Sequence, residues 1–171
     1  AVSEDIFIRK YSDTGTAAWA RTLDGEAVQT FCGTGTDGCG FVYLAGPSGV
    51  TPTVRRLDSS GTQVWERAFS STVFSGGEYA DTAVRNGRIV VLGTRWRMCS
   101  SSVFEEGVVA PVYDPAGNVA STFVHFSVKG EPRVDYSRIA WAPDGGVLVA
   151  GTVSNEGSWP ASINILRFTA G

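Results

Sequence analysis

Short runs of apolar residues, each bounded by glycine or by a turn dipeptide, follow one another along the whole chain. Within these runs apolar and polar side chains alternate, or β-branched and aromatic residues stand together. No stretch of about 11 or more residues keeps the 3.6-residue period of an amphipathic helix. The pattern therefore predicts an all-β protein. The expected strands contain Ile6, Ile8, Val64, Ile89, Val91, Val147, Val149, Ile163 and Ile165.

One turn sequence recurs four times. It closes on a glycine in each copy, and the copies are residues 9–15, 55–61, 111–117 and 166–171. Successive closing glycines are 46, 56 and 54 residues apart, which is close to the ~40 to 50 residues of a four-stranded propeller blade. In the first two copies a tryptophan, Trp19 or Trp65, follows the glycine by four residues. We expect these two side chains to anchor one repeat on the next.

A second series of turns lies between the first. Asp37-Gly38, Asn86-Gly87 and Asp144-Gly145 each lead into an apolar run that ends at glycine, and such dipeptides favour tight hairpins. If the strands of one repeat are labelled a to d, the chain is expected to run c-d, a-b-c-d, a-b-c-d, a-b-c, or thirteen strands. The first full repeat has its expected strands at 27–31, 41–45, 53–57 and 63–68.

These repeats predict a β-propeller-like array of four-stranded antiparallel blades within a single domain, residues 1–171. The repeat units are approximately 5–46, 51–93 and 108–151, with a partial unit at 161–171. Three repeats and a strand do not close a ring of 4 to 8 blades. Three alternatives therefore stay open: part of a longer propeller, a ring assembled from copies, or another β architecture such as a sandwich. An open arc would expose sheet edges that invite another chain.

The segment Asp5-Ile6-Phe7-Ile8-Arg9-Lys10-Tyr11, with Trp19 after the glycine turn, carries a family resemblance. It resembles the bacterial β-propeller repeat family of SBBP type, and the later repeats follow the same pattern more loosely. The resemblance implies a propeller repeat of the kind found in secreted or cell-surface bacterial proteins. It implies no set of catalytic residues.

The a-b and c-d turns should lie at one end of the strands, and the longer b-c and d-a loops at the other. One long b-c loop, expected from Gly93 to Gly107, concentrates an aromatic ring, two guanidinium groups and two carboxylates. Trp159 belongs to the next b-c loop. Because loops on a rigid scaffold often carry function, we predict a ligand-binding site of Arg95, Trp96, Arg97, Glu105, Glu106 and Trp159 for a protein or glycan. The alternative is that Trp96 packs beneath its own loop.

An enzyme is the competing class. Glu105 or Glu106 would act with Asp135 or Glu131 in a glycosidase or lyase, completed by residues outside this chain. Paired catalytic carboxylates must be held ~5 to 9.5 Å apart across a substrate, and neighbours in one loop rarely meet that condition. We therefore predict no catalytic residue and no cofactor.

Cys32 is expected at the end of an a strand and Cys39 at the start of the following b strand. Flanking one hairpin would bring their Cα atoms to the ~5.5 Å of a disulfide, so we predict a Cys32–Cys39 disulfide. The alternative is reduced thiols in a cytosolic protein. Cys99 should lie at the far end of the strands. No metal site is expected, because the chain lacks CxxC pairs and contains one histidine.

Three further features have structural explanations. Asp13, Asp58 and Asp114 are expected to bond to the backbone of their own turns, because each turn has too few oxygens for calcium. His125 is expected to pack between aromatic rings in a strand. The glycine-rich segment 33–38 lacks the Lys-Ser/Thr and the helix of a phosphate loop.

Charge and hydrophobicity argue against two classes of function, nucleic-acid binding and a membrane-spanning helix. The chain has 14 basic and 17 acidic residues, a formal charge of -3, so a nucleic-acid partner is not expected. No apolar run reaches the ~18 residues of a membrane-spanning helix. We predict a non-catalytic binding or scaffolding module that is extracytoplasmic (secreted, periplasmic or on the cell surface) and bacterial. Its expected partners are a protein or glycan ligand and other copies or the remainder of a longer propeller.

Overall fold

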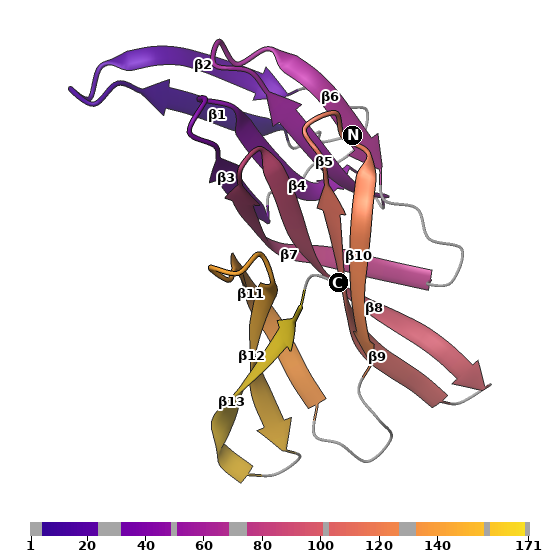
Figure 1. Ribbon diagram of the computed structural model, residues 1–171. Helices are drawn as coiled ribbons and strands as arrows, with labels where there is room; N and C mark the ends of the chain where they lie inside the picture. Colours follow the sequence, from indigo (N-terminus) through magenta and orange to yellow (C-terminus); the bar gives the residue numbers. More distant parts are fainter. Residues whose placement is uncertain are drawn as a thin grey trace.

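The computed structural model describes residues 5–23, 32–48, 51–68, 75–100, 103–126, 133–155 and 158–169. All secondary structure in these residues is β-strand and turn, with no helix. The all-β prediction is confirmed. The strands form four separate antiparallel sheets, here called sheets 1 to 4, which follow one another along the molecule (Figure 1).

Each sheet is a run of strands that are consecutive in sequence. Sheet 1 consists of β1 (Ile6–Tyr11) and β2 (Ala17–Leu23). Sheet 2 consists of β3 (Gly33–Thr36), β4 (Val42–Ser48), β5 (Thr51–Leu57) and β6 (Gln63–Ala68). Sheet 3 consists of β7 (Ser75–Arg85), β8 (Arg88–Ser100), β9 (Val103–Tyr113) and β10 (Val119–Phe126). Sheet 4 consists of β11 (Arg133–Trp141), β12 (Val147–Asn155) and β13 (Ser158–Phe168).

The described strands group as two, four, four and three, which is the expected c-d, a-b-c-d, a-b-c-d, a-b-c order. The bounds of the first a strand differ from the prediction. The described strand is β3, Gly33–Thr36, and the expected residues 27–31 lie outside the described part. The strand contains glycine because β3 lies against β7: a Cβ on Gly33 would be 2.9 Å from the backbone nitrogen of Thr82.

The hairpin turns share one geometry. In the turn between β5 and β6, the Asp58 nitrogen donates to the Thr62 carbonyl at 2.8 Å and the Gly61 nitrogen to the Asp58 carbonyl at 3.0 Å. Gly61 has a φ of 81°, a left-handed conformation that suits glycine and forms a bulge in the hairpin. The same pair of bonds closes the turns that begin at Ser12, Asp37, Asp114 and Ala142.

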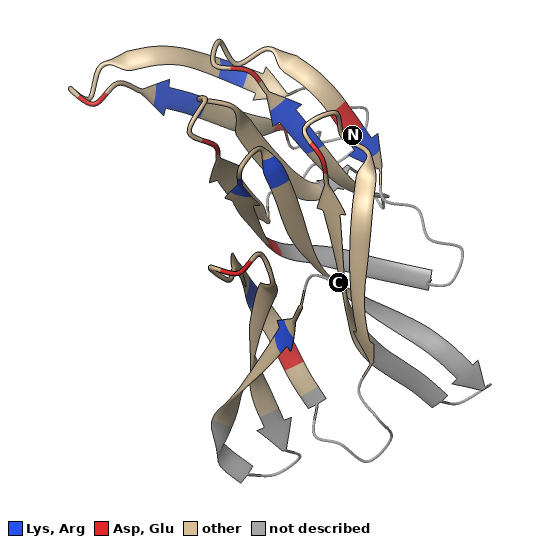
Figure 2. Ribbon diagram, in the orientation of Figure 1, with Lys and Arg blue, Asp and Glu red and all other residues tan. Residues whose placement is uncertain are grey.

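An aspartate opens several of these turns and accepts from its own backbone. Asp58 Oδ1 accepts from the nitrogens of Ser60 and Thr62, both at 2.9 Å, and Asp114 makes equivalent bonds. The prediction is confirmed for these two residues. The prediction is wrong for Asp13, because Ser12 occupies the position equivalent to Asp58 and its hydroxyl accepts from the Thr16 nitrogen. Acidic residues accordingly lie in the turns in Figure 2.

Two apolar clusters join the larger sheets. Strand β8 contributes to both, because alternate side chains of a strand point to opposite faces. Ile89 and Val91 face sheet 2, where they join a cluster with Tyr43, Ala45, Val54, Trp65 and Tyr113. Val90 and Leu92 face sheet 4, in a cluster with Val108, Ala110, Val112, Tyr136, Ile139, Val147 and Val149. Sheet 3 is thus packed between its two neighbours.

A tryptophan and the arginine two residues after it connect the last strand of one sheet to a hairpin turn of the following sheet. We call this pair the Trp-x-Arg clamp. From β6, Trp65 Nε1 donates to the Pro115 carbonyl at 3.0 Å, and Arg67 Nε donates to the Gly117 carbonyl at 3.0 Å. From β2, Trp19 Nε1 donates to the Ser59 carbonyl at 2.8 Å. Arg21 completes this clamp on Ser60, also at the turn between β5 and β6. The prediction that Trp19 and Trp65 anchor neighbouring repeats is confirmed.

Candidate functional site

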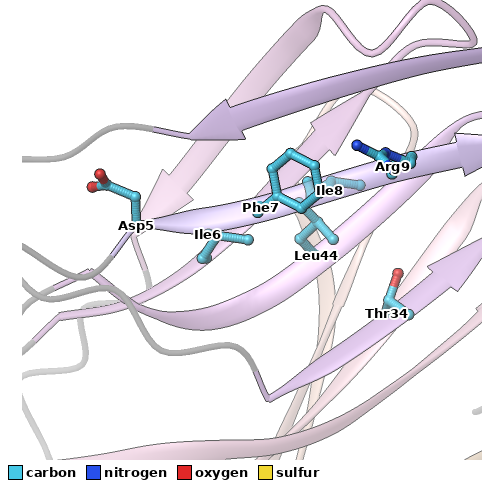
Figure 3. A pocket seen from close by; sticks show the side chains of 7 residues that line it. All are labelled: Asp5, Ile6, Phe7, Ile8, Arg9, Thr34 and Leu44. Atoms are coloured by element: carbon cyan, nitrogen blue, oxygen red, sulfur yellow. The ribbon is translucent and has the colours of Figure 1, made fainter.

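A groove lies between the edge of sheet 1 and the face of sheet 2. Its volume is about 420 Å³. Residues 5–9 at the start of β1 form one side, and Thr34 of β3 and Leu44 of β4 form the other (Figure 3). This is a concave, partly apolar surface at the junction of two sheets, a common setting for a binding site.

Strand β1 has an open edge along this groove. Within the described residues it pairs with β2 alone, and its other edge carries no strand. By contrast, the other c-type strands each have a b-type strand beside them, β4 beside β5, β8 beside β9 and β12 beside β13. An open edge presents backbone N–H and C=O groups that another strand can pair with.

The side chains of β1 alternate in exposure. Ile6 and Ile8 are half-buried, and Phe7 between them has 59% of its surface exposed. Across the groove Leu44 is only 4% exposed. The apolar surface left for an occupant therefore comes mainly from Ile6, Ile8 and the exposed ring of Phe7.

The groove carries opposite charges near its two ends. Figure 3 places the carboxylate of Asp5 at one end and the guanidinium of Arg9 toward the other, with the apolar side chains between them. The Arg9 guanidinium carbon lies 5.3 Å from the centre of the Phe7 ring, within the range of a cation–π contact. Among the described residues that line the groove, Asp5 is the single carboxylate.

The predicted b-c loop site has a different structure from the one expected. Arg95, Trp96 and Arg97 lie in β8, and Glu105 and Glu106 lie in β9, so these segments are paired strands. Trp96 is opposite Glu106, and Arg97 is opposite Glu105. The expectation of a long loop was wrong, because Thr94-Arg95-Trp96-Arg97-Met98 continues the strand pattern beyond Gly93. The side chains of the five predicted residues lie outside the described part.

Trp159 belongs to β13 of sheet 4, so it lies in another sheet from the other predicted residues. Its side chain is also outside the described part. The b-c loop expected around Trp159 is largely strand as well, with β12 continuing to Asn155 and β13 beginning at Ser158. Of the alternative acid–base residues, Asp135 is exposed on β11, and Glu131 lies outside the described residues.

The predicted Cys32–Cys39 disulfide is wrong, since neither residue is in a disulfide. Cys32 precedes β3, and its nitrogen donates to the Ala45 carbonyl. Cys39 lies in the turn that follows Thr36. The two residues are therefore at opposite ends of a four-residue strand, which separates them by ~13 Å at ~3.4 Å per residue. The side chain of Cys99, in β8, lies outside the described part.

His125 is half-buried on β10, and its ring meets the Tyr136 ring edge-on at a centroid distance of 6.5 Å. This agrees with the expected aromatic packing in a strand. The described residues contain no group of three or more His, Cys, Asp or Glu placed to hold a metal ion.

Sequence reasoning anticipated open sheet edges but did not select residues 5–9 as a site. Alternating side chains marked residues 6–11 as a strand, but the pairing of β1 with β2 alone among the described residues is visible only in the structure. The side chains that complete the groove, Thr34 and Leu44, come from the next sheet. Only the packing of sheet 1 on sheet 2 brings them to β1.

Comparison of the sequence with models of protein families gives no match, and comparison with curated proteins gives none either. The resemblance to the SBBP-type repeat thus remains an interpretation of sequence motifs. Within the described ranges, no helix has the length and apolar character required to cross a membrane.

Proposed function

We propose that this chain is a non-catalytic binding and scaffolding module of propeller-like architecture, whose open β1 edge accepts an extended strand of a protein partner. The observation that carries the proposal is the open edge of β1 beside an apolar groove. Strand addition to a free edge is a common mode of peptide recognition, in which backbone hydrogen bonds supply affinity and side-chain pockets supply specificity.

The propeller-like part of the proposal is supported by the way the sheets repeat. The first strands of sheets 2, 3 and 4 lie next to one another, β3 against β7 and β7 against β11. The last strands β2 and β6 each carry a Trp-x-Arg clamp to the following sheet. Inner strands in mutual contact and outer strands clamped to the next sheet are the arrangement of successive blades around an axis.

The side chains that a bound strand should carry follow from the neighbouring interface. Between sheets 2 and 3, alternate residues Tyr43 and Ala45 of β4 pack against Ile89 and Val91 of β8. Leu44 of β4 points to the other face, toward sheet 1, and holds the position that Val91 holds in sheet 3. A strand beside β1 would place alternate apolar side chains on the face that carries Ile6 and Ile8, next to Leu44.

The charges at the two ends of the groove indicate which end of a bound strand should be basic and which should be acidic. A basic residue of the partner would lie near Asp5, and an acidic residue near Arg9. Such exposed pairs add little to affinity, typically 0.2–1 kcal/mol, but they favour one direction of the added strand. We therefore propose a partner strand of alternating apolar residues with charged ends.

A peptide of residues 88–95, Arg-Ile-Val-Val-Leu-Gly-Thr-Arg, is a suitable probe of the apolar alternation because it comes from the b-type strand of sheet 3. Both of its charged residues are basic, so it does not test the proposed polarity of the charges. We expect saturable binding to the full chain, measured by calorimetry. The Val90→Asp/Leu92→Asp peptide should lose at least tenfold in affinity, because these positions face the next sheet in β8. The Ile89→Asp/Val91→Asp peptide is the matched control and should bind much as the parent does. Equal binding of all three peptides would contradict the proposal.

Several sequence-based predictions stay predictions. They are the ligand site on the β8–β9 hairpin with Trp159, a glycan as ligand, and a bacterial, extracytoplasmic location. One argument for an extracytoplasmic location no longer holds. A Cys32–Cys39 disulfide would have indicated an oxidising compartment, and the structure has no such disulfide.

A further inference from the structure

The turn between β1 and β2 has the same geometry as the two turns that the Trp-x-Arg clamps bind. In this turn the Ser12 nitrogen donates to the Thr16 carbonyl at 2.8 Å and the Gly15 nitrogen to the Ser12 carbonyl at 3.0 Å. These bonds have the same lengths as those of the Asp58–Gly61 turn, which the clamp of Trp19 and Arg21 occupies. The carbonyls of Asp13 and Thr14 correspond to those of Ser59 and Ser60.

In each of the two turns that bind a clamp, the tryptophan ring lies against the closing glycine. A Cβ on Gly61 would lie 2.9 Å from the Trp19 ring, and one on Gly117 would lie 2.9 Å from the Trp65 ring. Gly15 has the same left-handed conformation, with φ of 79°, but no atom of the described residues other than its chain neighbours lies within 4 Å of its Cβ position. Among the described residues, the surface that takes an indole in two turns is thus bare in this one.

The sequence limits what can occupy this turn. Trp-x-Arg occurs twice in the chain, at 19–21 and 65–67, and both pairs are engaged with turns of the chain itself. The equivalent positions of β10 hold Ser121 and Phe123, which supply neither indole nor guanidinium. A second copy of the chain therefore has no unengaged clamp to offer.

We infer that the Ser12–Gly15 turn is a docking site for a partner protein that presents an antiparallel hairpin with Trp-x-Arg on its outer strand. The indole would cover Gly15 and donate its N–H to the Asp13 carbonyl. The guanidinium would donate to the Thr14 carbonyl, and the exposed Asp13 carboxylate beside it adds a complementary charge. This inference goes beyond the proposed function, because it concerns a different surface of sheet 1 and a different strand type.

A backbone-cyclised peptide of residues 51–68 serves as the probe, because it contains the β5–β6 hairpin with Trp65 and Arg67. Cyclisation compensates for the marginal stability of an isolated hairpin, and the fold of the peptide is checked by its own NMR spectrum. Titrated into the labelled full chain, it should produce saturable shifts of the amide resonances of residues 12–16. The Trp65→Ala/Arg67→Ala version of the peptide should bind at least tenfold more weakly.

Two substitutions in the full chain form a matched pair. Asparagine tolerates positive φ, so Gly15→Asn should keep the turn while covering the surface for the indole. Gly145, with φ of 88° and no atom within 4 Å of its Cβ position, is the equivalent open glycine of another turn. Binding should weaken at least tenfold in Gly15→Asn and stay unchanged in Gly145→Asn.

Three results would overturn the inference: no binding of the folded hairpin, equal binding to both asparagine variants, or shifts confined to residues 58–62 or 114–118. Self-association of the unliganded chain that Gly15→Asn abolishes would also overturn it, because the occupant would then be a second copy. None of these results depends on whether a strand binds at the β1 edge, so this inference and the proposed function can fail separately.

Discussion

The indole of Trp65 lies directly on Gly117: a Cβ built on that glycine would be 2.9 Å from Cδ2 of the ring. The glycine belongs to the turn between β9 and β10 of sheet 3, and the tryptophan to β6 of sheet 2. This contact explains why the turn must end in glycine for two separate reasons. Its φ is 85°, and the neighbouring sheet leaves no space for a side chain.

The two reasons can be separated with alanine substitutions. Gly145→Ala should cost about 1–2 kcal/mol from positive φ alone, because the space around it is open. Gly117→Ala should cost about 1–3 kcal/mol more, since its Cβ must displace the Trp65 ring. Denaturant unfolding of both variants measures the difference. Equal losses would show that the indole does not constrain this turn.

The two clamp tryptophans should contribute unequally to stability. Trp65 is 7% exposed and lies in an apolar cluster, so Trp65→Ala should cost about 3–5 kcal/mol. Trp19 is only half-buried, and Trp19→Ala should cost about half as much because less apolar surface is exposed to water. Unfolding free energies for the two variants test the order. A greater loss at Trp19 would contradict it.

Turn carboxylates should make stability fall in acid. The Ser60 hydroxyl and the turn backbone lower the pKa of Asp58, and bonds from Asn118 lower the pKa of Asp114. A lowered folded-state pKa stabilises the protein above the unfolded-state pKa. That contribution is lost as pH falls from about 5 through the lowered value. Asp58→Asn/Asp114→Asn keeps an oxygen acceptor in each turn but removes the titration. The double variant should therefore show a shallower loss of stability below pH 5, and an unchanged slope would exclude these two turns as its cause.

Cys32 and Cys39 should both react as thiols. Iodoacetamide added to the denatured protein without reductant should modify both residues, measured by mass spectrometry of the peptides. Cys39, which is exposed, should also react rapidly in the folded protein. A recovered Cys32–Cys39 linked peptide would contradict the structure.

Local sequence signals were sufficient for much of this fold. Recurrent glycine turns and short apolar runs predicted the strand order and its division among sheets, because turn chemistry depends on a few adjacent residues. The lengths of the strands and the positions of residues within them were harder to predict from the sequence. The charged segment 94–100 was expected to be loop, although pairing with β9 extends β8 through it, and the cysteine pairing failed because β3 lies between Cys32 and Cys39.

The groove was harder to predict than the fold. Ile6, Phe7 and Ile8 were recognisable as strand residues, but the groove beside them depends on how β1 is paired, and among the described residues it pairs with β2 alone. Leu44 was recognisable as apolar, yet its side chain completes the groove only through packing between two sheets. Likewise Arg21 and Arg67 recur two residues after a tryptophan, but their role in the clamp is visible only with their carbonyl partners, 39 to 50 residues away.

Hydrogen–deuterium exchange at residues 5–11, with and without the peptide of residues 88–95, reports directly whether a strand adds to the edge of β1. If an extended strand adds to the open edge of β1, the amides of this segment should exchange more slowly in the complex. The edge strand β13 of sheet 4, followed through residues 162–168, is the internal reference and should be unaffected. Protection at 5–11 alone is the predicted result. Unchanged exchange at 5–11 under saturating peptide, or protection at β13 instead, would show that no strand adds to β1.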